Sequence, residues 1–180
     1  MPKLDKIYTR GGDEGKTSLA DGSRVSKADP IISLLGHLDE ANSYLGVAAC
    51  YIGLDRSMIH EIQNGLFDLG AYLSGAKLNV TQGMIDRMES EMDRLLKDQI
   101  PLTSFILPGG SEAAAHMHVA RAIVRRAETH AVFVMEQEEN LDPIVVKYLN
   151  RLSDLLFVWA RQRNNRGLND ILWVPGRTEE

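Results

Sequence analysis

Apolar residues recur at intervals of three and four along most of the 180-residue chain, after a polar, glycine-rich start that ends at about Lys27. This spacing places them on one face of an α-helix. In the first three such segments they are Ile31, Leu34, Leu35, Leu38, Leu45, Ala48 and Ile52, then Met58, Ile59, Ile62, Leu66, Leu69 and Leu73, then Met84, Ile85, Met88, Met92, Leu95 and Leu96. Two more helical segments follow, so the pattern predicts an all-α fold, a five-helix antiparallel bundle with short connections.

Residues that cap helices mark the expected boundaries. Asp, Ser and Thr side chains accept hydrogen bonds from the free amides of a first turn, and Pro is tolerated there. The segment PLTSFILPGG, residues 101–110, is instead β-branched and aromatic and closes on Pro-Gly-Gly, which predicts an ordered loop. The expected helix starts are Asp29-Pro30, about Asp55, Thr81, Ser111 and Asp142-Pro143, and the last helix is expected to end at about Asn164.

The composition is typical of one soluble globular domain. A net charge of -5 argues against a nucleic-acid-binding surface. The N-terminal MPKLDKIYTR lacks the apolar core of a signal peptide, and the apolar-leaning run 41–54 is too short to span a bilayer. We therefore expect a cytoplasmic protein that binds neither nucleic acid nor membrane. Cys50, in LGVAACYIG, is expected to be a buried small hydrophobe and not a nucleophile.

Three charged residues share one side of the fourth predicted helix. Within HVARAIVRRAE, Arg121, Arg125 and Glu128 stand at i, i+4 and i+7 among Ala, Val and Ile. A helix that packs normally has apolar residues in such a stripe, so the charges indicate an anionic or polar ligand opposite them. The alternative is a solvated face with weak ion pairs.

The N-terminal run YTRGGDEGKTSLADG comes close to a phosphate-binding P-loop, because Gly15-Lys16-Thr17 match the end of that motif. The motif's first glycine falls on Arg10, however, and the following SLADGSRV is not helix-like, so a Walker-type NTPase is rejected. Glycines interspersed with Lys, Arg, Thr and Ser still suit a loop that binds phosphate. A flexible tail rich in turn residues is the alternative.

Two other helices carry polar stripes, formed by Gly36, Asp39 and Ser43 on the first and by Asn150, Asp154, Phe157 and Arg161 on the fifth. The first stripe either faces solvent or lets Asp39 pair with an arginine, for which Arg121 is the obvious partner. Asn is a poor helix former, so Asn150 in mid-helix fits a functional role as well as it fits a plain surface position.

Neither a protein nucleophile nor a resident metal is indicated. A diiron site would need a Glu-x-x-His pair on two helices, and the chain contains none. The five histidines offer no convincing zinc spacing, and no Ser-His-Asp pattern is present. If the chain is an enzyme, we expect the reactive atom to belong to a cofactor.

Four segments together resemble, in order and spacing, the PduO-type ATP:cob(I)alamin adenosyltransferases, over a range from about Ile7 to Arg163. They are IYTRGGDEGKTSLADG, GHLDEANSYLG, FILPGGSEAAAHMHVARAIVRRAE and YLNRLSDLLFVWARQRN. The resemblance implies a homotrimer of five-helix bundles, with ATP and the corrinoid bound at subunit interfaces. It also implies transfer of the 5′-deoxyadenosyl group of ATP to the cobalt of cob(I)alamin, with release of triphosphate. The cobalt(I) centre would then supply the missing nucleophile.

The resemblance assigns roles to individual residues. Arg125 is expected to stabilise the leaving phosphates, and Glu128 to position the nucleotide and its Mg²⁺. Asp39 and Arg121 are expected to form a salt bridge across the subunit interface that shapes the corrinoid site, with Phe157 also at the corrinoid. The residues expected to bind ATP are Thr9, Arg10, Gly11, Gly12, Thr17, Ser18, Lys27, Arg125, Arg126, Glu128 and Asn150.

Phe105 matches the family's aromatic residue that lies below the corrin ring and displaces the lower axial ligand. The four-coordinate cobalt(II) that results is easier to reduce to cobalt(I). Without the resemblance, Phe105 would be interpreted as a hydrophobic anchor for its loop. Trp173, in the C-terminal NDILWVPGR, is a further candidate to close over the corrinoid.

We expect a single domain over residues 1–180, with a nucleotide-binding segment at 1–28, the helical bundle at 29–165 and a tail at 166–180. A cobalamin reductase and an adenosylcobalamin-dependent enzyme are the expected partners. The alternative function is a non-catalytic carrier or regulator that holds ATP or adenosylcobalamin on the same trimer.

Overall fold

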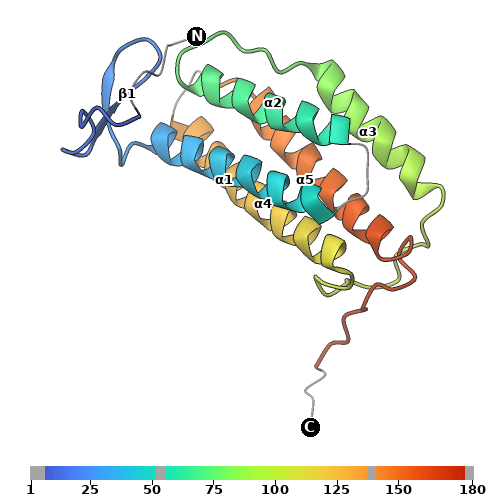
Figure 1. Cartoon of the computed structure of the whole chain (residues 1–180). Coiled ribbons are helices and arrows are strands. Elements are labelled where there is room, and N and C mark those ends of the chain that lie inside the picture. Colours follow the sequence, from blue (N-terminus) through green and yellow to red (C-terminus); the bar gives the residue numbers. More distant parts are fainter. Residues whose placement is uncertain (1–6, 52–55, 138–140, 177–180) are drawn as a thin grey trace.

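The computed structural model describes residues 7–51, 56–137 and 141–176. Its elements are β1 (Lys16–Ser18), β2 (Arg24–Ser26), α1 (Pro30–Tyr51), α2 (Arg56–Leu73), α3 (Gln82–Leu96), α4 (Glu112–Gln137) and α5 (Ile144–Arg163). The helices form one bundle, shown in Figure 1. The five predicted helices are therefore confirmed, whereas the predicted positions of Ile52 and Asp55 lie outside the described residues.

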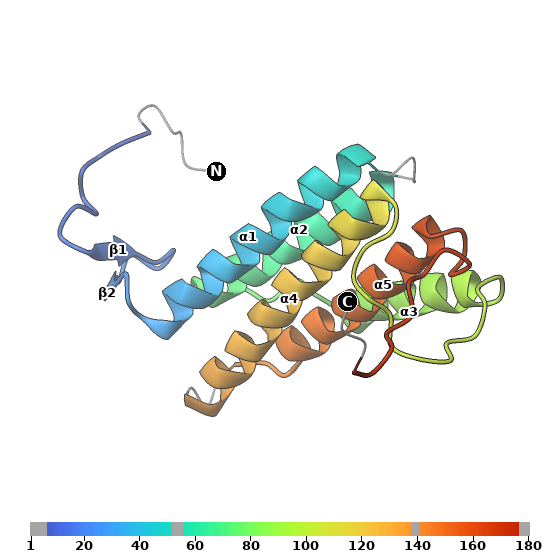
Figure 2. The same cartoon turned by 90° about the horizontal axis from the view of Figure 1, so that it is seen from below.

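Neighbouring helices follow the order α2, α1, α4, α5, α3 across the bundle (Figure 2). α1 runs antiparallel to α2 and α4, and α4 runs antiparallel to α5 (Figure 1). α3 and α5 run parallel, because Lys147 and Arg151 of α5 donate hydrogen bonds to Gln82 and Glu89 of α3, each at 2.7 Å. The connection over residues 74–81 crosses the bundle, so α3 starts at the same end as α5 (Figure 1). Helices that follow one another in the chain therefore run antiparallel, as predicted, and α3 and α5 share a direction because this alternation places them two steps apart.

The glycine-rich start contains a small antiparallel hairpin, in which Thr17 of β1 pairs with Val25 of β2. The hairpin lies at one end of the bundle, beyond the first turn of α1 (Figures 1 and 2). Its tip reaches the end of α2, where the Ala20 amide donates to the Ser74 carbonyl at 3.0 Å. The sequence predicted no strand here, because three-residue strands in a polar run are too short for a recognisable alternation.

The apolar stripes form the core, and most of their members are buried. Leu34, Leu45, Leu66 and Ile85 are at most 2% exposed. The prediction for Cys50 is wrong: this residue is exposed, while Ala48 takes the inward position on α1. None of the described helices is long and apolar enough to cross a membrane.

The predicted caps are confirmed in three of four helices. The Asp29 carboxylate accepts from the Ile31 amide and the Asp142 carboxylate from the Ile144 amide, each at 2.9 Å. The Ser111 hydroxyl accepts from the Ala114 amide at 3.2 Å. Thr81 occupies the cap position of α3, but its side chain makes no capping hydrogen bond.

Candidate functional site

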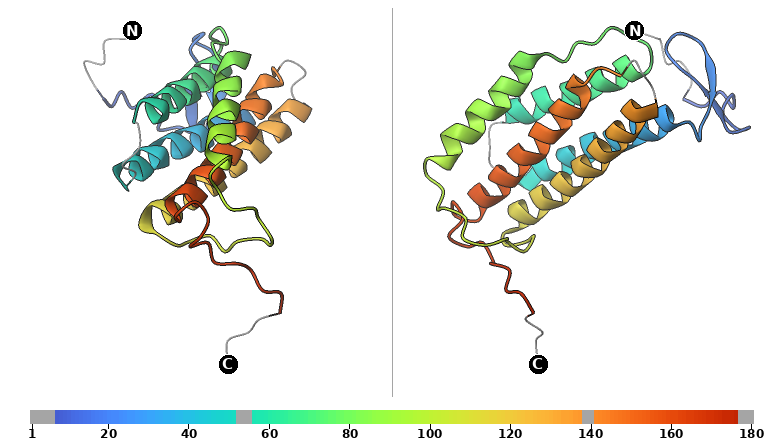
Figure 3. Two further views of the ribbon diagram at one scale, coloured as in Figure 1. Left: turned by 90° about the vertical axis from the view of Figure 1, so that its right-hand side faces the viewer. Right: turned by 180° about the vertical axis from the view of Figure 1, so that it is seen from behind.

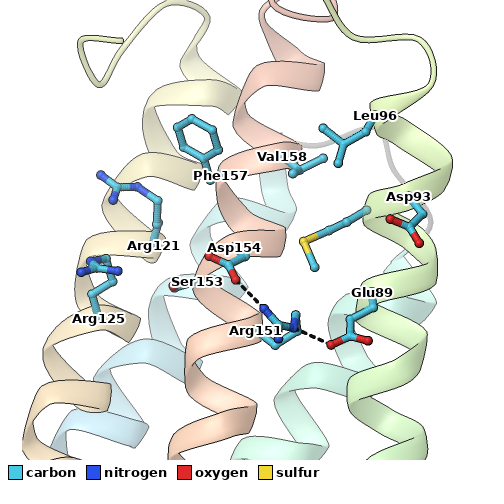
Figure 4. A pocket seen from close by; sticks show the side chains of 11 residues that line it. Glu89, Asp93, Leu96, Arg121, Arg125, Arg151, Ser153, Asp154, Phe157 and Val158 are labelled. Atoms are coloured by element: carbon cyan, nitrogen blue, oxygen red, sulfur yellow. Dashed lines mark hydrogen bonds and ion pairs between the residues drawn. The ribbon is translucent and has the colours of Figure 1, made fainter. Parts of the chain in front are cut away.

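A groove of about 480 Å³ crosses α3, α4 and α5. In Figure 4, Arg121 and Arg125 of α4 lie on one side of the groove, and Glu89 and Asp93 of α3 lie on the other. Leu96, Phe157 and Val158 form an apolar strip toward one end of the groove (Figure 4). The lining residues are Glu89, Met92, Asp93, Leu96, Arg121, Arg125, Arg151, Ser153, Asp154, Phe157 and Val158.

The positive charges of Arg121 and Arg125 are not neutralised within the described ranges. Neither residue forms an ion pair there, and the buried Nε of Arg121 has no hydrogen-bond partner. Burial, and then the nearby charge of Arg125, lower the pKa of Arg121. Two like charges one turn apart on a helix destabilise each other. The pair therefore favours an anion that binds in the groove.

An ion-pair chain occupies the middle of the groove. Arg151 donates to Glu89 of α3 at 2.7 Å and to Asp154 at 2.8 Å (Figure 4). The hydrogen bond with Glu89 is the main cause that raises the pKa of Arg151. Sequence reasoning missed Glu89 and Asp93 as groove residues, although their spacing puts both on one face of α3. Arg161, grouped with Asp154 by its spacing, is instead buried and does not line the groove.

Glu128 and Asn150 meet between α4 and α5, where the Asn150 amide donates to the Glu128 carboxylate at 2.7 Å. Magnesium is often held by one or two carboxylates together with substrate phosphates. In the described part of the chain, no group of three His, Cys, Asp or Glu side chains could hold a metal by itself. The site therefore fits a Mg²⁺ ion that arrives with a nucleotide, with Glu128 as its carboxylate.

His118 lies between α4 and α5, edge-on to Phe157 with ring centroids 6.1 Å apart. It is 2% exposed, and neither ring nitrogen has a hydrogen-bond partner among the described residues. Burial, followed by the positive charge of Arg121, lowers the pKa of His118, while Asp170 partly opposes this shift. The folded protein therefore favours the neutral ring.

This lowered pKa predicts a pH-dependent stability. As pH falls, His118 takes up a proton at about pH 6.5 in the unfolded chain, but only at a lower pH in the folded chain. The free energy of unfolding therefore decreases as pH falls below about 6.5. A His118→Leu variant should lose less stability on acidification, by up to about 1.4 kcal/mol per pH unit for one proton. Urea unfolding at pH 7.5, 6.5 and 5.5, at one protein concentration, measures this.

The exposed His60 supplies the control, because His60→Leu should leave the acid dependence of the wild-type protein in place. The free energy of unfolding should still decrease somewhat with pH in the His118 variant, since burial also lowers the pKa of His37. Identical pH profiles for wild type and His118→Leu would contradict the prediction.

The predicted pair of Asp39 and Arg121 does not form within the chain. Asp39 lines shallow grooves between α1 and α2, together with Asn42 and the 70% exposed Phe67, whereas Arg121 lines the groove described above. Arg126 points to α1 and forms an ion pair with Glu40. Of the three arginines of α4, therefore, only Arg121 and Arg125 face the groove.

The N-terminal residues predicted to bind ATP lie together but away from the groove. The Arg24 side chain donates to the Gly11 carbonyl at 2.6 Å and to the Ser18 hydroxyl at 3.3 Å. The Lys27 amine lies 3.0 Å from the position that a Cβ of Gly12 would take. Sequence reasoning missed Arg24, which connects this loop to the hairpin. Thr9, Arg10, Gly11, Gly12, Thr17, Ser18 and Lys27 all lie outside the groove that contains Arg125.

Phe105 is 79% exposed on the loop over residues 101–110. Its ring meets Trp173 edge-on with centroids 6.1 Å apart, and the Trp173 amide donates to the Phe105 carbonyl at 2.8 Å. The loop and the C-terminal segment lie at the end of the bundle where α4 starts and α5 ends (Figure 3). The structure therefore brings together two residues that the sequence assigned separately to the corrinoid.

The fold and the groove define a helical-bundle protein with a site for an anionic ligand beside an apolar strip. The family model for cobalamin adenosyltransferase matches residues 7–163. The chain belongs to this family and is a transferase with corrinoid adenosyltransferase function.

Individual relatives agree with this assignment. The chain is 43% identical over 188 residues to a corrinoid adenosyltransferase of Mycobacterium leprae (strain TN), covering 96% of this chain and 97% of the relative. It is 40% identical over 180 residues to a cobalamin adenosyltransferase of Cupriavidus metallidurans, with 97% of both chains covered. A variant PduO-type ATP:corrinoid adenosyltransferase from Lactobacillus reuteri, solved with cobalamin and ATP, superposes with a TM-score of 0.86. It is 33% identical, and the match covers 94% of this chain and 97% of that one.

Proposed function

We propose that the protein transfers the 5′-deoxyadenosyl group of ATP to the cobalt of cob(I)alamin and releases triphosphate. The observation that carries this proposal is the groove, where Arg121 and Arg125, which form no ion pair with any described residue, stand beside an apolar strip that contains Phe157. Such a site suits a polyphosphate next to a flat, largely apolar macrocycle. The Lactobacillus reuteri relative with cobalamin and ATP supports the same pair of ligands.

In this reaction the cobalt(I) electron pair forms the Co–C5′ bond, and the C5′–O bond of ATP breaks. The bonding pair leaves with triphosphate, so negative charge grows on the leaving oxygen. Arg125 would neutralise this charge as a preorganised donor. Glu128, held by Asn150, would position Mg²⁺ on the phosphates. The remaining proposed ATP-binding residues are Thr9, Arg10, Gly11, Gly12, Thr17, Ser18, Lys27 and Arg126.

Phe105 would act on the second substrate. Its exposed ring can occupy the space below the corrin, where it would keep the lower axial ligand away from cobalt. Loss of that ligand eases the one-electron reduction of cobalt(II), for which a cobalamin reductase would supply the electron. An adenosylcobalamin-dependent enzyme would receive the product.

We propose that three copies of the chain complete three sites at their interfaces. Within one chain the N-terminal phosphate-binding loop lies away from Arg125, and Asp39 lies in a different groove from Arg121. A neighbouring copy would bring Asp39 to Arg121 and the N-terminal loop to the groove. In this arrangement residues 1–28 bind nucleotide, residues 29–165 form the bundle and residues 166–180 form a tail.

An anaerobic assay tests the proposal. ATP and chemically reduced cob(I)alamin are mixed with the protein, the absorbance change of Co–C bond formation is followed, and the phosphate product is identified. Adenosylcobalamin and triphosphate in equal amounts are the expected products. Tight binding of ATP or corrinoid without turnover would instead support a carrier or regulator, and formation of pyrophosphate would contradict the proposed bond cleavage.

A further inference from the structure

The loop that carries Phe105 and the C-terminal segment form one unit. Ile106 and Leu172 make an antiparallel bridge, and the Leu107 amide donates to the Ile171 carbonyl at 2.8 Å. With the bond from the Trp173 amide to the Phe105 carbonyl, two backbone hydrogen bonds flank the exposed aromatic ring. The orientation of Phe105 therefore depends on where the C-terminal segment is held.

A buried set of three polar residues, Arg161, Asn164 and Asp170, anchors both parts of this unit. We call it the polar cluster. Arg161 donates to the Asp170 carboxylate at 2.7 Å, and both side chains are at most 4% exposed. The amide of Asn164 donates to the other carboxylate oxygen of Asp170 at 3.0 Å. The cluster thus ties the last turn of α5 to Asp170, the residue before the C-terminal segment begins.

Two of these three residues, Arg161 and Asn164, hold both ends of the Phe105 loop. Arg161 donates to the Ile100 carbonyl at 2.8 Å, directly before the loop. Asn164 donates to the Gly109 carbonyl and accepts from the Ser111 amide, both at 3.0 Å, where the loop ends. A loop fixed at its two ends and paired along its middle has little freedom to move.

Two glycines show how closely the backbone fits this cluster. A Cβ on Gly110 would lie 2.2 Å from the side-chain oxygen of Asn164, and one on Gly167 would lie 2.4 Å from the Arg161 guanidinium. Both glycines also have positive φ angles, of 101° and 93°. Any other residue at these positions would displace the cluster.

We propose that Arg161, Asn164 and Asp170 are positioning residues for adenosyl transfer, because they hold the Phe105 loop against the C-terminal segment and so direct Phe105 at the corrinoid. This inference rests on the role of Phe105 proposed above. The cluster is bonded to the loop of Phe105, which we place at the corrinoid, and it does not contact Arg125 or line its groove, so its effect is expected on the corrinoid and not on ATP.

The isosteric Asp170→Asn variant tests this inference, with Val80→Ala as a control for lost stability. Val80 is buried at 4% exposure in the connection between α2 and α3, away from the cluster. In Asp170→Asn we expect a weaker spectroscopic signal of four-coordinate cob(II)alamin in the presence of ATP. The kcat for adenosyl transfer should drop by about tenfold or more, whereas the Kd for ATP should stay unchanged. Val80→Ala should keep the signal. A folded Asp170→Asn with the wild-type signal would overturn the inference.

Hydrogen exchange on the wild-type protein provides a test that requires no variant. If the cluster holds the unit together, the amides of Leu107, Trp173 and Asn169 should open with one common free energy. Independent opening of Leu107 and Trp173 would overturn the inference. The role of Phe105 is tested separately, because a Phe105→Ala variant with an unchanged four-coordinate signal would refute the proposed function of that residue and not the coupling.

Discussion

Arg125→Ala is expected to reduce adenosyl transfer to a small residual rate while the proposed subunit assembly stays intact. Arg125 is exposed in the groove and has no ion pair among the described residues, so its removal leaves no broken contact inside the fold. Loss of one preorganised donor to a developing negative charge lowers kcat by about 100- to 1,000-fold. Single-turnover formation of adenosylcobalamin, with size-exclusion chromatography for the assembly, measures both parts of the prediction.

Arg87→Ala is the matched control. Its side chain is 62% exposed on α3 and pairs with Glu61 at 3.5 Å, outside the groove. This variant should transfer the adenosyl group at the wild-type rate. The transfer rate of Arg125→Lys should lie between those of Arg125→Ala and Arg87→Ala, because lysine keeps the positive charge but lacks the planar guanidinium group. Normal activity in Arg125→Ala would remove Arg125 from the proposed mechanism.

Phe105→Ala is expected to slow adenosylation far more than it weakens ATP binding. The ring is 79% exposed and meets Trp173 edge-on outside the apolar core, so truncation should leave the bundle stable. If the ring displaces the lower ligand of the corrinoid, its loss should lower kcat by about tenfold or more, equivalent to about 1.4 kcal/mol. Calorimetric titration of ATP and steady-state rates with cob(II)alamin and a reductant separate the two effects.

Leu102→Ala provides a control in the same loop, since Leu102 is 48% exposed and does not line the groove. Its rate and its ATP affinity should both match wild type. Equal losses of rate and ATP affinity in Phe105→Ala would mean that the ring only supports the loop.

The helices and their caps could be predicted because they depend on local rules. The apolar stripes required only a spacing of three and four, and Asp29, Ser111 and Asp142 required only a first turn to cap. The charged stripe on α4 was also informative, since Arg121 and Arg125 do line the groove. The packing of α3 against α5 could not be predicted, because the apolar stripe of a helix does not specify which other helix it contacts.

The candidate site was harder to predict wherever it depends on contacts between distant elements. Glu89 of α3 joins the groove through Arg151 of α5, 62 residues later in the chain. Spacing along one helix contains no information about such a partner. Arg161 is an instructive case, because its spacing grouped it with Asp154 and Phe157, which line the groove, whereas its ion pair with Asp170 holds it in the interior.

The exposed Cys50 has a practical consequence. It is the only cysteine in the chain, and its thiol lies on the outer side of α1, 3.5 Å from the Gly46 carbonyl. A maleimide dye or a nitroxide would therefore attach at one defined position without mutation of other thiols. Distances between such labels on different copies would give the spacing of the α1 helices in the proposed trimer directly in solution.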